Sequence, residues 1–330
     1  MKKIKDILLE FKGYIITIIL VLIIFNINLP YYIMAPGGII PISDRVEVSN
    51  NKDTKGSINL LYVTQYNGNV SSLLMSLFMP EWKVEKLSNE QLSNETLEEI
   101  HTRNKIMLDN SIQNAIFVAY NSLGKEIKIN NKRNIVIGTT NDNEIKINDE
   151  ILKINDIEVE SVDTIKEVIK DTNISDKVKL TVKRNDKELE LYVPVTLSNN
   201  YKVLGIVVIT NYDYELDPKI NIKFKESESG ASGGLMTAVT IYNAISDEDI
   251  TKGLNIGGTG TIDINGNVGE IDGVNYKIMG AAKNKLDVVF VPKANYEEAI
   301  NTKNKYNYNL EIISVDKFND VIEYLKNYKK

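Results

Sequence analysis

The chain of 330 residues is long enough for two or three domains. Its 43% hydrophobic and 25% charged residues are typical of a folded protein, and a net charge of −6 without a basic patch argues against nucleic acid as a partner. The chain has no cysteine and a single histidine, His101, which excludes disulfides, a thiol nucleophile and a multi-histidine metal site. We therefore predict no metal and no cofactor.

The N-terminal segment is apolar from Tyr14 to Met34. This run is long enough to cross ~30 Å of hydrocarbon as a helix, and the lysines that precede it favour a cytoplasmic N-terminus. We expect a cytoplasmic tail over residues 1–12, a transmembrane helix over 13–34 in contact with the lipid bilayer, and an extracytoplasmic remainder of a single-pass protein of the cell membrane. A cleaved signal peptide is the competing interpretation, but no small-residue cleavage motif cleanly follows the apolar core.

Residues 35–125 are predicted to form a connecting region with strands and helices. Two strands are expected in it, Arg45–Ser49 and Ser57–Thr64. The apolar cluster Leu73–Met79 favours a core or interdomain helix, with contact to a membrane surface as the alternative. A further helix is expected to end at Gly124 and to begin at one of three polar residues, Asp109, Asn110 or Ser111.

Residues 126–198 read as a compact unit of strands around one helix. The expected elements are the strands Asn134–Ile137, Val178–Lys183 and Glu188–Pro194, and the helix Val162–Ile169. This order resembles a bacterial PDZ domain, and Asp149-Glu150-Ile151-Leu152-Lys153-Ile154-Asn155 is similar to the turn and strand of that family. Asn148 stands where the family usually has glycine. The resemblance implies binding of a protein or peptide by strand addition.

Residues 199–330 alternate between strand-like and helical patterns, which predicts a mixed α/β domain. The expected strands are Leu204–Ile209, Ile220–Phe224, Gly260–Ile264, Val288–Val291 and Leu310–Ile313. The expected helices are Leu235–Ile245, Asn275–Leu286, Tyr296–Asn301 and Lys317–Asn327. Asn265-Gly266 carries the strongest short hairpin signal of the chain.

The turn Gly230-Ala231-Ser232-Gly233-Gly234 is the main candidate for chemistry. It precedes a helical run, so its N–H groups are unpaired and the helix dipole favours developing negative charge. A serine nucleophile needs donors of this kind for an oxyanion. We predict Ser232 as the nucleophile, with Gly230, Ala231 and Gly233 supporting the turn. An ordinary helix N-cap is the alternative interpretation of Ser232.

The base for such a serine is predicted to be Lys277, because His101 lies in a polar, solvated stretch. An ordinary lysine pKa near ~10.4 makes the neutral amine cost ~4.6 kcal/mol at pH 7. Burial can lower a lysine pKa by ~3–5 units, which covers that cost. Thr259 can orient the amine through its hydroxyl. The alternatives are a surface lysine whose stem covers apolar side chains, and a threonine that serves only as a turn residue.

These residues give the C-terminal part a specific resemblance to the proteolytic domain of the Lon family. That family places a serine–lysine dyad in a "GPSAG" turn and a later "GGLKEK" helix. Here the turn reads Gly230-Ala231-Ser232-Gly233-Gly234, and the second element reads Asp272-Gly273-Val274-Asn275-Tyr276-Lys277. The run Gly258–Ile271 is similar to the "TGEItlrGxVlpIGG" segment of the family, where Thr259 matches the threonine that supports the lysine. Asp287–Pro292 resembles its "vlIP" strand.

The whole chain resembles the membrane-anchored, PDZ-containing Lon-like proteases of Gram-positive bacteria. The resemblance implies an ATP-independent serine endopeptidase that cleaves polypeptides at the outer face of the membrane through an acyl-enzyme. No G-x-x-x-x-G-K-[ST] motif is present. Glu226 and Glu228 can shape substrate choice or simply lie in a solvated loop. A catalytically silent, membrane-tethered PDZ-type binding module is the alternative function, and self-association into a homo-oligomer stays open.

Overall fold

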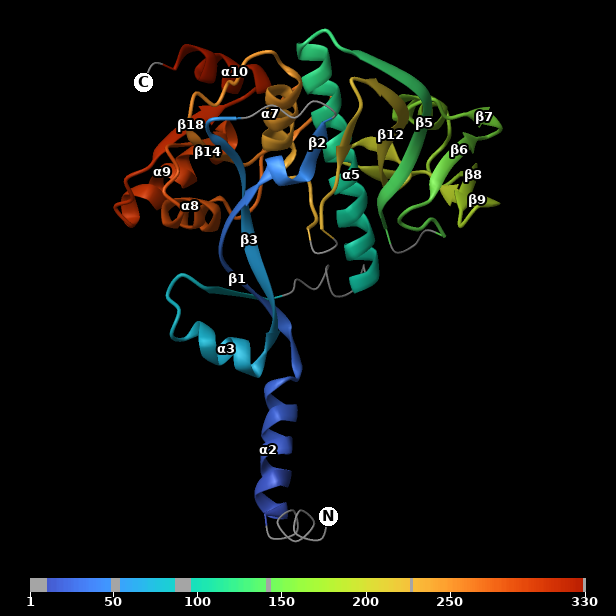
Figure 1. Ribbon diagram of the computed structural model, residues 1–330. Helices are drawn as coiled ribbons and strands as arrows, with labels where there is room; N and C mark the ends of the chain where they lie inside the picture. The colour runs from blue at the N-terminus through green and yellow to red at the C-terminus, as the bar shows by residue number, and fades with distance from the viewer. Residues whose placement is uncertain (1–10, 49–53, 87–95, 141–143, 226–227, 329–330) are drawn as a thin grey trace, which may run out of the picture.

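The computed structural model describes residues 11–48, 54–86, 96–140, 144–225 and 228–328. Two six-stranded sheets lie on opposite sides of the long helix α5 (Leu97–Ser122), as Figure 1 shows. The fold is therefore mixed α/β, as the sequence predicts. Polar side chains of α5 form hydrogen bonds with elements on both of its sides.

The first sheet has the strand order β18-β17-β14-β3-β1-β4. Its strands are β1 (Asn28–Pro41), β3 (Ser57–Asn69), β4 (Lys83–Lys86), β14 (Asn255–Gly258), β17 (Val288–Pro292) and β18 (Glu311–Val315). The strands β3, β14, β17 and β18 run parallel, whereas β1 pairs antiparallel with both β3 and β4. Strands from the first quarter of the chain thus complete a sheet that carries the C-terminal elements.

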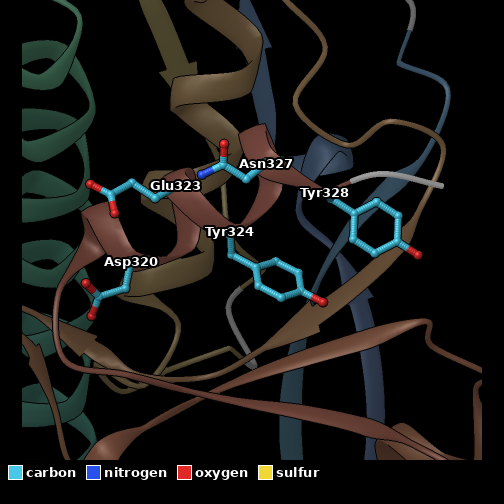
Figure 2. A pocket seen from close by; sticks show the side chains of 5 residues that line it. All are labelled: Asp320, Glu323, Tyr324, Asn327 and Tyr328. Carbon is cyan, nitrogen blue, oxygen red and sulfur yellow. The ribbon is translucent and has the colours of Figure 1, made fainter.

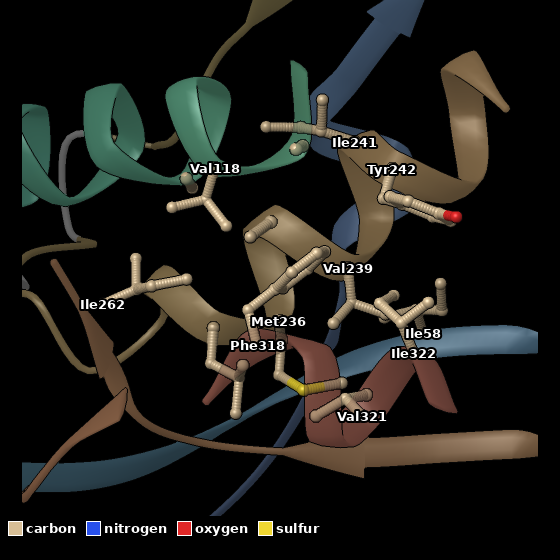
Figure 3. Close-up of a cluster of buried hydrophobic side chains, with 14 of the residues drawn as sticks. Ile58, Val118, Met236, Val239, Ile241, Tyr242, Ile262, Phe318, Val321 and Ile322 are labelled. Atoms are coloured by element: carbon tan, nitrogen blue, oxygen red, sulfur yellow. The ribbon is translucent and has the colours of Figure 1, made fainter. Parts of the chain in front are cut away.

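Helices cover both faces of this sheet. Val288 and Phe290 of β17 pack with α5, α7 (Gly234–Ile245) and α10 (Phe318–Asn327). Val289 and Val291 face the other way, toward α8 (Val274–Lys283) and α9 (Tyr296–Lys305). A strand buried on both faces is expected to be a continuous apolar run, as β17 is. Figure 3 shows the first of these clusters, in which apolar side chains of α7 meet those of α5 and α10.

The second sheet has the order β12-β5-β6-β8-β9, with β7 (Ile157–Glu158) paired to β6. Its other strands are β5 (Glu126–Thr139), β6 (Glu150–Ile154), β8 (Lys177–Arg184), β9 (Lys187–Pro194) and β12 (Ile206–Asp217). Helix α6 (Val162–Lys170) buries Ile165 and Ile169 against it. Asn148 has a φ of 74°, in the left-handed region that glycine favours and asparagine tolerates. This explains how asparagine replaces the usual glycine there.

Short elements complete the fold. Three two-stranded sheets pair β2 (Val46–Val48) with β13 (Ile220–Ile222), β10 (Thr196–Ser198) with β11 (Tyr201–Val203), and β15 (Thr261–Ile262) with β16 (Val268–Gly269). The 3₁₀ turns are η1 (Ile42–Arg45) and η2 (Lys293–Asn295). The strand expected at Arg45–Ser49 therefore starts one residue later, and Ser49 lies outside the described residues. The Asn265-Gly266 turn joins β15 to β16, which confirms that hairpin.

The N-terminal helix α2 (Lys12–Phe25) is shorter than the helix expected over 13–34. The Asn26 side chain donates a hydrogen bond to the Leu22 carbonyl at 2.8 Å, at the point where the helix ends. Residues 28–34 belong instead to β1 and pair with β3 and β4. Among the described residues, no helix combines the length and the apolar character that a membrane crossing requires. The predicted helix is thus wrong in its C-terminal part.

The apolar cluster at 73–79 is not part of a core. Helix α3 (Val70–Ser76) starts from a capping box between Asn69 and Ser72 and is followed by exposed side chains. Leu77 is 77% exposed and Phe78 is 81% exposed. Figure 1 places α3 at the end of the β1–β3 ribbon, beside α2. The prediction of a core or interdomain helix is wrong, because this ribbon carries α3 away from the two main cores.

Helix α5 begins much earlier than expected. Its N-cap is Thr96, whose hydroxyl accepts a hydrogen bond from the Glu99 N–H at 3.2 Å, while the Glu99 carboxylate accepts from the Thr96 N–H at 2.8 Å. The expected caps Asp109, Asn110 and Ser111 therefore lie in the middle of the helix. His101 is exposed on its first turns.

Candidate active site

Lys277 lies on α8 with its side chain inside the protein. Gly273 precedes the helix with a φ of 67°, and the helix buries Val274, Ile278 and Ala281 against the first sheet. Lys277 itself is only 3% exposed, and its Nζ donates a hydrogen bond to the Thr259 hydroxyl at 3.0 Å. The alternative of a surface lysine is therefore wrong.

Burial lowers the pKa of Lys277 to about 8, because desolvation disfavours the charged ammonium. The negative charge of Asp272 opposes this effect and raises the pKa of Lys277. The balance leaves a sizeable fraction of neutral amine near neutral pH. A lysine of this kind can accept a proton and later return it.

Thr259 links the lysine to the turn that carries Ser232. It follows β14 directly, is 0% exposed, and its N–H donates to the Phe290 carbonyl at 3.1 Å. Its hydroxyl donates to the Ser232 carbonyl at 3.1 Å and accepts from Lys277. Because a hydroxyl has one proton, these two bonds fix its direction. Thr259 is thus a buried side chain with a defined polar role and does more than occupy a turn.

The turn around Ser232 is held mainly by its carbonyls. Gly230 has a φ of 89°, and the Ser232 carbonyl accepts a second hydrogen bond from the Gly260 N–H at 2.8 Å. Helix α7 takes Gly233 as its N-cap and has no side-chain capping bond, so the interpretation of Ser232 as an ordinary N-cap is wrong. No described residue accepts a hydrogen bond from the N–H of Ser232 or of Gly233.

The structure brings the candidate residues together through Thr259. Within the described chain, the hydrogen bonds run from the Lys277 amine to the Thr259 hydroxyl and from there to the Ser232 carbonyl. No hydrogen bond joins the Ser232 hydroxyl directly to the Lys277 amine. The supporting residues Gly230, Ala231 and Gly233 form the turn itself, where a Cβ added to Gly233 would lie 3.0 Å from the Leu60 side chain.

The loop before the turn is anchored by an ion pair. Arg45 donates two hydrogen bonds to the Glu228 carboxylate, at 2.7 and 3.2 Å, and the Lys225 N–H adds a third at 2.6 Å. Burial favours a higher pKa for Glu228, but these hydrogen bonds lower it below its ordinary value. Glu228 is therefore an anchored residue of this loop. Glu226 lies outside the described residues.

Two hollows on the described surface lie elsewhere. One, of about 430 Å³, lies along α10 and is lined by Asp320, Glu323, Tyr324, Asn327 and Tyr328 (Figure 2). The other, of about 270 Å³, lies near Thr240 and Asn243 of α7. Neither is lined by Ser232, Thr259 or Lys277. Across the described ranges, no group of three or more acidic or histidine side chains is placed to hold a metal ion.

Two residues near the site carry no signal in the sequence. Asp272 acts on the Lys277 pKa through its charge, and Ser111 of α5 donates a hydrogen bond to the Ala231 carbonyl at 3.0 Å. Acidic residues are common next to turns, so the position of Asp272 in the sequence does not indicate an effect on Lys277. Ser111 is 120 positions away from Ala231 along the chain, so only the fold reveals the contact.

Replacing Asp272 with asparagine is expected to lower the pKa of Lys277 further, because it removes the charge that stabilises the ammonium. The titration of the Lys277 amine should move to lower pH by less than about one unit, and high salt should shrink the difference since Asp272 is exposed. An NMR titration of the lysine side chain between pH 6 and 10 measures the shift. Movement of the titration to higher pH would contradict this role of Asp272.

Two parts of the chain match families of known proteins. Residues 222–327 match the family described as Lon protease (S16) C-terminal proteolytic domain, and residues 118–195 match the PDZ domain family. The chain therefore contains a Lon-type serine protease domain and a PDZ domain.

Curated relatives support the first of these matches. The chain is 30% identical over 118 residues to a Lon protease of Mesomycoplasma hyopneumoniae, which is 35% of this chain and 13% of the relative. It is 30% identical over 121 residues to a Lon protease of Campylobacter jejuni, covering 33% of this chain and 15% of that protein. The chain thus spans 13% and 15% of the length of these two relatives.

One solved structure is similar to the second part. It is the PDZ domain of an SdrC-like protein from Listeria monocytogenes, at 19% identity, with 25% of this chain and 93% of that chain covered and a TM-score of 0.23. With so low a TM-score the likeness carries no argument, so the PDZ assignment rests on the family match over residues 118–195.

Proposed function

We propose that this chain is a serine endopeptidase in which Ser232 is the nucleophile, Lys277 is the general base and acid, and Thr259 orients the amine. The observation that carries the proposal is the buried Lys277 amine, held by the Thr259 hydroxyl, which is itself bonded to the nucleophile's own carbonyl. A lysine with a pKa of about 8 can exchange protons at neutral pH. The Lon-type proteolytic domain supports the same assignment.

The proposed reaction requires the Ser232 hydroxyl to turn toward the Lys277 amine. The neutral Lys277 amine takes the proton of the Ser232 hydroxyl as its oxygen attacks the scissile carbonyl carbon. The free N–H groups of Ser232 and Gly233 receive the oxyanion. The Lys277 ammonium then protonates the leaving amine, and the carbon–nitrogen bond breaks to give an ester on Ser232. Lys277 finally deprotonates a water molecule, which attacks the ester carbon. The Lys277 ammonium then returns this proton to the Ser232 oxygen as the ester bond breaks and the acyl group leaves as a carboxylic acid.

Substrates are polypeptides, and cleavage proceeds without ATP. Both the proteolytic domain and the PDZ domain support proteins or peptides as the molecules that the chain recognises. The printed sequence carries no G-x-x-x-x-G-K-[ST] motif. The PDZ unit presents an extended segment of the substrate by pairing with a strand edge.

Covalent labelling tests the proposed nucleophile. The full chain is expected to react with a fluorophosphonate, and digestion followed by mass spectrometry should place the adduct on the peptide that contains Ser232. Ser232→Ala should remain unlabelled, whereas the matched variant Ser246→Ala at the other end of α7 should label normally. A chain that binds peptides tightly yet acquires no adduct is the catalytically silent binding module, and that result would refute the protease.

The chain is anchored in the cell membrane through the apolar N-terminal run, with the N-terminus cytoplasmic and the protease on the outer face. The side chains of α2 support this, since none of them is buried and nearly all of its length is apolar. The exposed Leu77 and Phe78 directly follow α3, and α3 lies at the same end of the molecule as α2 (Figure 1). Exposed apolar side chains gathered at one end favour contact with lipid.

Trp82, the only tryptophan of the chain, is expected to report on that contact. Its backbone N–H donates a hydrogen bond to the Met79 carbonyl at 2.9 Å and its ring stacks on Tyr66, so it lies beside the exposed cluster. The full chain should float with phospholipid vesicles, and brominated lipids should quench Trp82. Glutamine at Leu77 and Phe78 should reduce the quenching by about half or more, because burial of each side chain is worth ~1.5–3 kcal/mol.

Glutamine at two other exposed apolar residues, Leu197 and Tyr201 on β10 and β11, serves as the control and should leave the quenching unchanged. A chain that does not float with the phospholipid vesicles would contradict the anchoring. A chain that floats with an unquenched Trp82 would leave α2 as an anchor and exclude the contact after α3.

A further inference from the structure

Helix α5 carries polar side chains in its middle, where they cannot serve as caps. Ser111 and Gln113 are each 4% exposed, although both lie far from the helix ends. Polar residues in a helix interior are expected to point to solvent or to bond the preceding turn. Here they bond other elements, so each of them must have a specific partner across an interface.

Ser111 reaches the turn of the proposed nucleophile. Its hydroxyl donates a hydrogen bond to the Ala231 carbonyl at 3.0 Å. A Cβ added to Gly234 would lie 2.6 Å from the hydroxyl oxygen of Ser111. The Gly230 N–H donates to the Asn104 carbonyl of α5 at 3.1 Å. The turn therefore rests on α5 at two successive residues, directly before Ser232.

A carbonyl that is held fixes the N–H on the other side of its peptide plane. The peptide bonds from Ala231 to Gly233 are trans, so the carbonyl of Ala231 and the N–H of Ser232 point in opposite directions in one rigid plane. The Ala231 carbonyl accepts from Ser111 at 3.0 Å and from the Gly234 N–H at 3.2 Å, so Ser111 supplies the only side-chain bond among the described residues that holds this plane and, with it, the direction of the Ser232 N–H. Thr259 and the Gly260 N–H hold the Ser232 carbonyl in the same way and set the direction of the Gly233 N–H.

We propose that Ser111 is a positioning residue of the oxyanion site, which acts by fixing the peptide plane whose N–H donates to the oxyanion. The inference rests on the proposed protease function. It extends that function to a residue on a different helix, outside residues 222–327 that match the proteolytic domain family. Since oxyanion donors act only if they are aimed at the developing charge, a misdirected N–H lowers the rate of acylation more than it lowers substrate binding.

The same helix is fixed from its other side. Asn110 donates to the Thr210 carbonyl at 3.1 Å and to the Asn211 side chain at 2.8 Å, both on β12. Gln113 accepts from the Tyr212 N–H at 2.6 Å. These bonds lock the position of α5 along β12 of the second sheet, which gives Ser111 a rigid base from which to hold the turn.

The variant Ser111→Ala tests the proposal in the full chain. We expect kcat for peptide hydrolysis to fall by about 10- to 100-fold while KM stays within about threefold, because the donor is misdirected rather than removed. A peptide boronate, which mimics the tetrahedral oxyanion, should bind correspondingly more weakly. The position of the acidic pH limb should not move, since Lys277 is untouched. Ser111→Thr, which keeps a hydroxyl, should recover most of kcat.

Ser246→Ala is the matched control, because this serine also donates to a backbone carbonyl, that of Glu248, at the other end of α7. A purely structural role would lower the melting temperature of Ser111→Ala and leave kcat and boronate affinity at the level of Ser246→Ala, which would overturn the proposal. If Ser111→Ala does not fold, Ser111→Cys, with a weaker donor of similar size, gives the same comparison. Undiminished activity in Ser232→Ala would instead refute Ser232 as the nucleophile and with it the proposed function, so the two failures are distinguishable.

Discussion

Replacing Lys277 with methionine is expected to lower kcat/KM for peptide hydrolysis by on the order of 10⁴- to 10⁶-fold. Methionine keeps the apolar stem in the α8 cluster and removes only the amine that Thr259 holds. Without a base the Ser232 hydroxyl stays protonated. Ser232→Ala should cause a loss of the same size, and the double variant should lose no more, because residues that act as a unit fail together. Initial rates on a fluorogenic peptide measure all three.

The control for this prediction is Lys283→Met on the same helix. Lys283 is exposed and pairs with Glu81 at 2.7 Å, so its loss should leave the rate within about twofold. A Lys277→Met variant that retains a tenth of the activity would show that another group deprotonates Ser232.

The second large effect of this substitution is on stability, which we expect to rise while activity falls. Lys277→Met is expected to raise the free energy of unfolding at neutral pH, because the native protein keeps a charged amine in a buried site below pH 8. The lysine pKa is about 8 in the folded chain and 10.5 in the ordinary state. As pH rises from 8 to 10.5, the folded protein releases a proton that the unfolded chain still holds, so the native lysine protein gains stability.

The stability gap between Lys277→Met and the native protein should therefore be about 3 kcal/mol wider at pH 7 than at pH 10.5. Urea unfolding of both proteins at the two pH values measures the difference, in which the titration of all other groups cancels. Lys283→Met should show no comparable pH dependence. A gap that widens with pH would mean that the folded pKa of Lys277 lies above its ordinary value.

The C-terminal helices are well predicted from the sequence because each is short and carries apolar residues at helical spacing. Helices α7, α8 and α10 begin within one residue of their expected starts. Strand β14 escapes prediction, since half of its four residues are glycines that give no β-strand pattern. Both positions need glycine because side chains pack directly against the backbone there. A Cβ added to Gly257 would lie 2.2 Å from the Leu286 side chain, and one added to Gly258 would lie 2.4 Å from the Met236 side chain.

Pairing between β-strands that are distant in the sequence is the main feature that the hydrophobic pattern does not predict. Residues 35–125 read as a connection, yet β1, β3 and β4 belong to the same sheet as β14 and β17. The polar run before Asp109 obscures the start of α5, because the residues that face β12 and the Ser232 turn are polar rather than apolar. Only their partners, distant in sequence, explain why they lie inside a helix.

The candidate site also contains residues that local sequence motifs indicate and residues that only long-range contacts reveal. Ser232, Thr259 and Lys277 are candidates from the sequence because each lies in a local motif of glycines and small residues. Ser111 is not, since its role depends on a contact across 120 positions. The pKa of Lys277 needs the structure as well, because its value depends on burial and on Asp272 together.

The interleaved order of the first sheet also bears on how the chain is made. Strand β14 hydrogen-bonds to β3 on one side and to β17 on the other, so the floor beneath the proposed dyad joins a segment synthesised early to segments synthesised last. Until β14 and β17 have been synthesised, β3 has no parallel neighbour and the surroundings of Lys277 are not closed. We therefore expect the proposed dyad to assemble only late in the synthesis of the chain.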